Sequence, residues 1–149
     1  MNPFKKMEKL PARKNIRLRY YNYKEDGYYF VTICCSNQEH NLKKYKKIAE
    51  NILYNLPIKF SGLEIDYFVF MPTHMHAIFI FEGCRAGLGE VVRTFKALVT
   101  KETGVKNFWQ RNYYEHVIRN ENALLKIREY IQNNPAVSKI QFKEFYGKM

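Results

Sequence analysis

The sequence predicts one α+β domain, in which helices cover a four-stranded antiparallel sheet. Short runs of β-branched and aromatic residues indicate strands, and longer runs with an apolar residue every three or four positions indicate amphipathic helices. These runs follow one another in the order β-α-β-β-α-β, with one more helix near the end of the chain. The length of 149 residues suits a single domain, so we expect one domain over 1–149 with a basic arm at 1–27.

The first half of the chain is predicted to form a strand, a helix and a second strand. Residues 28–35 read Tyr-Tyr-Phe-Val-Thr-Ile-Cys-Cys, which is typical of a central strand. A helix ended by Pro57 follows, with its apolar stripe at Leu42, Tyr45, Ile48, Ala49, Ile52, Leu53 and Leu56. The second strand is indicated by apolar or aromatic residues at alternate positions, namely Leu63, Ile65, Tyr67 and Val69.

The second half is predicted to form a strand, a helix and a fourth strand. The short turn at 71–73 predicts that residues 74–81 return as the antiparallel partner of the second strand. The next helix ends at Gly104, and its apolar stripe consists of Leu88, Val91, Val92, Phe95 and Leu98. A connector at 108–111 leads to the fourth strand, 113–118.

The chain then forms a last helix, which Asn120 or Asn122 can cap and Pro135 stops. Its buried stripe is Leu124, Ile127 and Ile131. The complete order is that of a ferredoxin-like fold, with the last helix added to it.

The charge of the chain favours a polyanionic partner. Lys and Arg number 25 against 14 Asp and Glu, a formal net charge of +11. Neutralising phosphates drives much of nucleic-acid affinity, and the 12 Tyr, 11 Phe and one Trp provide rings on which unpaired bases can stack. The alternative is a charge surplus that only keeps the chain soluble.

Several basic residues are candidates for contacts with a nucleic-acid backbone. In the arm these are Arg13, Lys14 and Arg17, for which a solvated tail is the alternative. On the second helix, Arg93 and Lys96 form a row with Thr100, for which a solvated helix face is the alternative.

The cysteines and the N-terminus indicate a cytoplasmic protein. The three cysteines, of which two are adjacent, do not have the spacing of a disulfide or zinc framework. The N-terminal residues are charged, without the apolar core of a signal peptide, and the longest largely apolar run, 28–35, is too short to span a bilayer.

Two histidines stand at the entrance of the third strand. Residues i and i+2 of a strand point to the same face, so His74 and His76 would present two imidazoles side by side. Metal sites usually have three or more ligands, and such a pair is more often incidental. On the last helix, Tyr130 and Asn134 are neighbours at i and i+4. If that face meets the sheet near the histidines, a hydroxyl nucleophile and an amide oxygen approach the same point.

These residues fall in motifs that resemble a known family. The segment Met-Pro-Thr-His-Met-His at 71–76 is similar to the HUH motif (histidine, hydrophobic residue, histidine) of single-tyrosine transposases. The blocks 109–119 and 130–135 resemble later blocks of that family, and 13–35 and 87–101 resemble the REP-associated tyrosine transposases in particular. The resemblance covers nearly the whole chain in the right order. The central methionine stands where valine is common, and it is also apolar.

The resemblance implies cleavage and rejoining of single-stranded DNA at or beside hairpins. Tyr130 would be the nucleophile and form a 5′-phosphotyrosine link, while His74 and His76 would bind Mg²⁺ or Mn²⁺. The third metal ligand falls on Asn134, with the two preceding residues, 132 and 133, as alternatives.

Further residues of these blocks are candidates for DNA contacts. Trp109, Arg111 and Tyr113 could stack on or clamp the DNA, and a core role is the alternative for Trp109. We expect a structural role for His116. Relatives include dimers that share the tyrosine helix and monomers that act in cis, and we favour a monomer. Two other interpretations remain open: a domesticated protein that binds hairpins or single strands without cutting, and a metal-dependent hydrolase that uses water.

Overall fold

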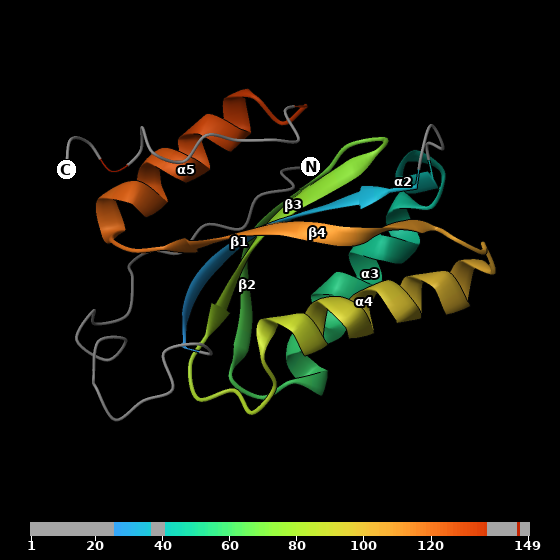
Figure 1. The fold of residues 1–149 in the computed structure, drawn as a ribbon, viewed down its shortest axis with the longest axis horizontal. Coiled ribbons are helices and arrows are strands. Elements are labelled where there is room, and N and C mark those ends of the chain that lie inside the picture. Colours follow the sequence, from blue (N-terminus) through green and yellow to red (C-terminus); the bar gives the residue numbers. More distant parts are fainter. Residues whose placement is uncertain (1–25, 37–40, 137–145, 147–149) are drawn as a thin grey trace.

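The computed structural model describes residues 26–36, 41–136 and 146, which form one sheet with helices on both faces (Figure 1). The strands are β1 (Gly27–Cys35), β2 (Leu63–Phe70), β3 (His74–Phe81) and β4 (Trp109–Ile118). The helices are α2 (Asn41–Lys44), α3 (Lys46–Lys59), α4 (Leu88–Thr103) and α5 (Glu121–Asn133). No helix among these described ranges is long and apolar enough to cross a membrane.

The four strands form one antiparallel sheet in the order β2-β3-β1-β4. The two central strands, β1 and β3, are joined over their whole length, from Gly27 opposite Phe81 to Cys34 opposite His74. This strand order, with α3 and α4 packed on one face, confirms the predicted α+β, ferredoxin-like fold with an added C-terminal helix.

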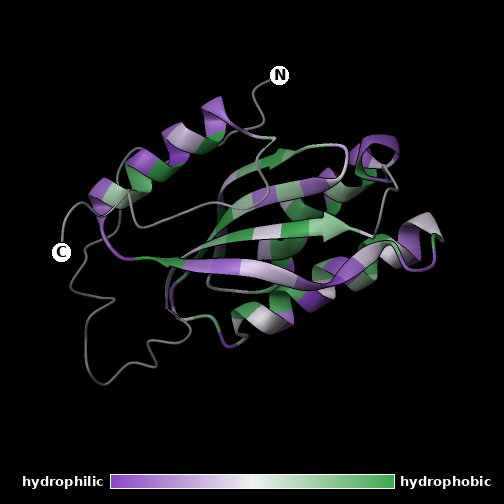
Figure 2. Cartoon of the chain, turned by 45° about the horizontal axis from the view of Figure 1, so that its top comes forward, coloured by the Kyte–Doolittle hydropathy of each residue, from purple (hydrophilic) through white to green (hydrophobic). Residues whose placement is uncertain are grey.

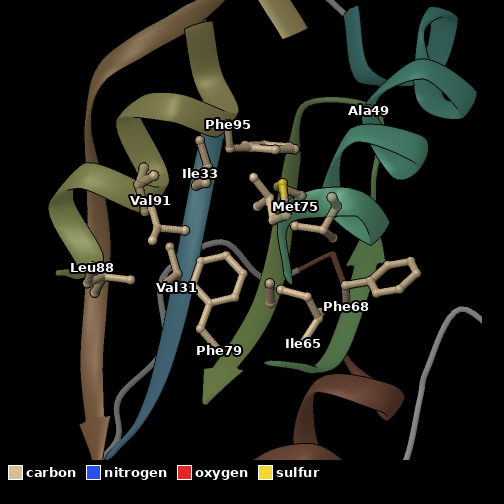
Figure 3. Packing of buried hydrophobic residues seen from close by; sticks show 14 of the residues in the cluster. Val31, Ile33, Ala49, Ile65, Phe68, Met75, Phe79, Leu88, Val91 and Phe95 are labelled. Carbon is tan, nitrogen blue, oxygen red and sulfur yellow. The ribbon is translucent and has the colours of Figure 1, made fainter. Parts of the chain in front are cut away.

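The face of the sheet that carries α3 and α4 holds the larger hydrophobic core. Figure 3 shows how Val31 and Ile33 of β1 and Met75 and Phe79 of β3 pack beneath Phe95 of α4. Along each strand these residues alternate with residues of the other face. The fully buried Met75 lies between the two histidines in sequence, so its burial on the α3–α4 side directs both imidazoles to the opposite side.

The opposite face is covered by α5 (Figure 1). Its smaller hydrophobic cluster, called here the α5-side cluster, consists of Tyr28, Phe30, Tyr67, Ile78, Ile80, Ile118, Ala123, Leu124, Ile127 and Ile131. The predicted stripe of the last helix is therefore buried as expected. Asn120 caps this helix, since its side-chain oxygen accepts a hydrogen bond of 2.7 Å from the backbone N–H of Ala123.

The predicted alternation of β2 is wrong after Ile65, because the strand contains a bulge. Ile65 pairs with Phe79 and Tyr67 pairs with Ile78, so Asp66 is an extra residue in the ladder. Every later side chain of β2 then changes face. Tyr67 joins the α5-side cluster, and Phe68 joins the core beneath α3.

The first helix, the buried stripe of α4 and the start of the fourth strand also differ from the prediction. The first helix is interrupted at Tyr45, and it continues past Pro57 to Lys59. In α4 the buried residue is Val99 rather than Leu98, while the helix ends as predicted at Gly104, whose φ of 71° is left-handed. The fourth strand begins at Trp109, within the predicted connector, because Trp109 pairs with Cys35 of β1.

Candidate active site

The two histidines of β3 lie side by side beneath α5. Their ring centroids are 4.9 Å apart and the ring planes cross at 66°. Both residues are buried, with exposed fractions of 5% for His74 and 0% for His76. Buried polar groups require partners, so the contacts of each ring define what the pair can do.

His76 is held from the neighbouring central strand. Its Nδ1 atom lies 2.8 Å from the hydroxyl oxygen of Thr32, the residue directly opposite on β1. Its ring also stacks on Phe30, with centroids 5.3 Å apart. If Nδ1 donates its hydrogen to the Thr32 hydroxyl, the Nε2 lone pair is available for a cation, an arrangement common around metal-bound imidazoles.

His74 is held from the end of α5. Its Nε2 atom donates a hydrogen bond of 3.0 Å to the carbonyl oxygen of Pro135, and its Nδ1 atom lies 3.3 Å from the Thr73 hydroxyl. A carbonyl oxygen can only accept, so this ring carries its proton on Nε2. Burial lowers the pKa of His74, while the bond to Pro135 raises it in partial compensation. A lowered pKa keeps the imidazole neutral near pH 7, as metal binding requires.

The predicted nucleophile belongs to α5, the helix that covers the histidine face of the sheet. Tyr130 is half-buried and packs against the α5-side cluster. Asn134 is the exposed C-cap of the helix, and its side-chain nitrogen donates 2.9 Å to the carbonyl oxygen of Tyr130. Within this turn it is Pro135, one residue after the predicted ligand Asn134, that contacts His74 directly. The end of α5 thus reaches the histidine pair through the carbonyl oxygen of Pro135.

A buried ion pair fixes α5 to the sheet. Arg128 donates from Nε to Oδ2 of Asp66 at 2.9 Å and from Nη2 to Oδ1 at 2.6 Å, with side-chain exposures of 5% and 0%. This parallel, two-bond geometry is directional. Asp66 is the bulge residue of β2, and Arg128 lies two positions before Tyr130. The bulge therefore sets the position of the tyrosine helix.

The donor groups at this site fit a divalent cation. The part of the chain that the structure describes has no group of three or more His, Cys, Asp and Glu side chains able to hold a metal. The candidates are thus two imidazoles, which suit transition ions, and amide or carbonyl oxygens at 134–135, which suit Mg²⁺ and Mn²⁺. Ligation through Nε2 of His74 requires the present hydrogen bond to Pro135 to be given up.

The predicted DNA contacts on α4 lie on the side of the sheet away from the histidines. Arg93 and Lys96 belong to α4, which covers the face opposite the histidines. Arg93 is exposed, whereas Lys96 donates from Nζ to the carbonyl oxygens of Gln110 (2.9 Å) and Arg111 (3.2 Å). The three basic residues predicted in the arm, 13, 14 and 17, lie outside the described residues.

The aromatic candidates of β4 face α4 rather than the histidines. Trp109 contacts Phe95, and its Nε1 donates 3.2 Å to the carbonyl oxygen of Lys96, in agreement with a core role. Tyr113 is half-buried on the same side, with the Lys96 ammonium 6.0 Å from its ring centroid. Arg111 is exposed.

His116 has a structural partner, as expected. Its Nε2 atom lies 2.7 Å from the hydroxyl of Tyr146, and this hydroxyl also accepts from the N–H of Arg119 and donates to the carbonyl oxygen of Val117. Tyr146 thereby attaches a distant part of the chain to the end of β4.

The burial of His116 predicts that the folded protein loses stability in acid. Burial, with a smaller effect of the Arg119 charge, lowers the pKa of His116 from 6.5 to about 4. Between these values the unfolded chain binds a proton that the folded chain does not, so the free energy of unfolding is retained above pH 6.5 and falls as the pH drops towards about 4. Urea unfolding across this range should show a shallower fall for His116→Gln. An identical fall in both proteins would contradict this assignment.

Sequence reasoning did not identify the ion pair or the groups that orient the imidazoles. Arg128 stands beside Ile127 on the apolar stripe of α5, and Asp66 interrupts the apolar run of β2. Charged residues are rarely buried unless they are paired, so these two positions could have been predicted as partners from the sequence. Thr32 and the Pro135 carbonyl gave no such signal, because their contacts depend on strand pairing and helix docking.

Comparisons with known proteins give a consistent set of relatives. No protein-family model matches the chain. It is 39% identical over 158 aligned positions to an uncharacterized protein of Haemophilus influenzae, covering 83% of this chain and 88% of that one. It is 29% identical over 116 positions to a REP-associated tyrosine transposase of Escherichia coli K12, covering 76% and 68%.

Solved structures agree with these sequence relatives. A REP-associated tyrosine transposase bound to a REP hairpin superposes with a TM-score of 0.69 and 26% identity, over 80% of this chain and 73% of that one. A transposase-like protein of Deinococcus radiodurans, at 17% identity, shares the fold with a TM-score of 0.54, over 76% and 94% of the two chains.

Proposed function

The chain belongs to the single-tyrosine HUH transposases, within the REP-associated tyrosine transposases, and we propose that it cleaves and rejoins single-stranded DNA at or near hairpins. The observation that supports this most directly is the 3.0 Å contact between His74 and Pro135. It joins the histidine pair of β3 to the end of the helix that carries Tyr130. Two imidazoles and a tyrosine helix are the parts that such a reaction requires.

The residues of the site have distinct roles in this proposal. His74 and His76 would hold a divalent cation, Mg²⁺ or Mn²⁺, with Asn134 as the third ligand. The cation, when bound, polarises a non-bridging phosphate oxygen and stabilises the charge of the transition state. Thr32 orients His76 through the 2.8 Å contact at Nδ1, as outer-shell partners of metal-bound imidazoles do.

Tyr130 is the proposed nucleophile. Its hydroxyl oxygen attacks phosphorus and loses its proton, and the bond from phosphorus to the 3′-oxygen breaks. That oxygen takes up a proton and leaves as a 3′-hydroxyl, while the 5′-phosphate stays on the tyrosine. The phosphotyrosine bond retains the energy of the phosphodiester, so a 3′-hydroxyl can reverse the step without a nucleotide cofactor.

We propose that the tyrosine acts in cis, in a monomer. Ile127 and Ile131 of α5 are buried against the sheet of the same chain, and Arg128 pairs with Asp66 of that sheet. The intramolecular contacts therefore favour a site that one chain completes.

A labelled hairpin assay tests the reaction. The protein is incubated with DNA hairpins that carry single-stranded flanks and a label on either end, with Mn²⁺ or Mg²⁺, and the products are separated on denaturing gels. We expect a covalent adduct between the protein and the fragment 3′ of the cut, formed only with the ion and lost with a chelator. Cleavage without an adduct would indicate water as the nucleophile, and binding without cleavage would support the non-catalytic alternative.

A further inference from the structure

The fourth strand contains an irregularity near the histidine site. Cys35 of β1 pairs with Trp109, and Ile33 pairs with Tyr113, so four steps along β4 correspond to two steps along β1. The intervening residues 110–112 therefore leave the regular ladder. Bulges of this kind redirect side chains and are frequent beside functional sites.

The backbone of this bulge is held in place from the α4 side. Lys96 donates to the carbonyl oxygens of Gln110 and Arg111, and its own carbonyl oxygen accepts from the Trp109 ring. Burial lowers the pKa of Lys96. The two hydrogen bonds from this lysine stabilise the backbone of the bulge, so the side chains of 110–112 project from a fixed backbone.

An open pocket of about 460 Å³ lies at the bulge. Its lining residues are Ser36, Gln110, Arg111, Asn112 and Tyr114. They provide one guanidinium, two amides, two hydroxyls and one aromatic ring, and none of the five is acidic. The volume falls in the range of about 300–1,000 Å³ typical of ligand pockets. Figure 2 shows the outer strand that leads to α5 largely in hydrophilic colours, unlike the strand beside it.

One lining residue of this pocket, Tyr114, lies on the histidine side of the sheet. Thr32 pairs with His76 on one side and with Tyr114 on the other, and directly paired residues point to the same face. Tyr114 is thus two strands from His76, roughly 10 Å at the usual strand spacing. Ser36 follows Cys34, the partner of His74, by two residues, and its hydroxyl donates to the carbonyl oxygen of Asn107.

We propose that this pocket binds one unpaired nucleotide of the DNA strand that passes the histidines. The proposal rests on the proposed function, because that strand is its substrate. Tyr114, with 49% of its surface exposed, stacks on the base. Arg111 contacts the adjoining phosphate, and the amides of Gln110 and Asn112 hydrogen-bond the base edge. The pocket would therefore contribute both affinity and base preference beside the cleavage point.

Binding measurements with an abasic scan test the pocket. Fluorescence anisotropy is recorded with chelator present, on hairpins in which each nucleotide of the single-stranded flank is made abasic in turn. At one position the wild type should lose about 5- to 150-fold in affinity, the usual contribution of one stacked base. Tyr114→Ala should bind the intact flank with the same loss and be insensitive to the abasic change there. Tyr114→Phe should retain wild-type affinity.

Two further variants complete the test. Tyr54→Ala removes a tyrosine of similar exposure (47%) from α3, on the opposite face, and should bind normally. Asn112→Ala should change the ranking of the four bases at the sensitive position. The proposal is overturned if no position is sensitive, or if Tyr114→Ala keeps the full abasic effect. Adding Mn²⁺ to the same samples measures adduct formation separately from binding. An adduct without Tyr114-dependent binding would refute only the proposed pocket. Tyr114-dependent binding without an adduct would refute only the proposed cleavage reaction.

Discussion

Tyr130→Phe should form no covalent adduct with a hairpin substrate and should still bind that hairpin with wild-type affinity. The change removes only the hydroxyl oxygen that attacks phosphorus. The ring, which packs half-buried against the α5-side cluster, is preserved. Loss of a covalent nucleophile typically lowers the rate by ~10³-fold or more, so the adduct should fall below detection on a denaturing gel.

A matched variant separates this effect from a general loss of tyrosine. Tyr54→Phe makes the same change on α3, on the far side of the sheet, and should give the wild-type yield of adduct. Cleavage that persists in Tyr130→Phe, with or without an adduct, would show that another group attacks the phosphate. Comparing the two variants at equal hairpin occupancy removes any difference in binding.

Arg128→Met should produce the largest loss of stability among single substitutions of the charged residues of α5. It leaves the fully buried carboxylate of Asp66 without its cation. Breaking a buried pair in this way typically costs about 3–5 kcal/mol in the free energy of unfolding, because the remaining charge is desolvated. Urea denaturation measures this loss. Because the pair holds the tyrosine helix on β2, adduct formation should fall as well.

Two controls identify the ion pair as the cause. Lys126→Met removes an exposed cation from the same helix and should change the free energy of unfolding by less than about 0.5 kcal/mol. The double variant Asp66→Leu with Arg128→Met removes both charges and should recover most of the loss, since apolar replacement of a whole buried pair is often neutral. Equal effects of Arg128→Met and Lys126→Met would refute the proposed role of the pair.

Local patterns were sufficient to predict the order of the elements. The β-branched run of β1, the stripes of α4 and α5, the Asn120 cap and the Gly104 terminus all report interactions between residues close in sequence. The same locality explains the histidine pair. The i, i+2 spacing alone determined that His74 and His76 share a face, once β3 forms.

Long-range pairing decided what those patterns could not. The face of Tyr67 depends on the extra residue at Asp66, which β2 tolerates because Arg128 of a distant helix neutralises the carboxylate. Similarly, only strand register aligns Tyr114 with Thr32 and His76, and makes Tyr114 rather than Tyr113 the ring on the histidine side.

The sequence by itself determined the fold class, the family resemblance and the paired imidazoles, because each depends on spacing within one element or on a contiguous motif. The tertiary structure alone brought the Pro135 carbonyl to His74, buried Arg128 against Asp66 and formed the pocket at the bulge of β4. The reason is physical: these contacts join residues of different elements, and their geometry follows from bulges and helix docking, which reflect the packing of the whole chain.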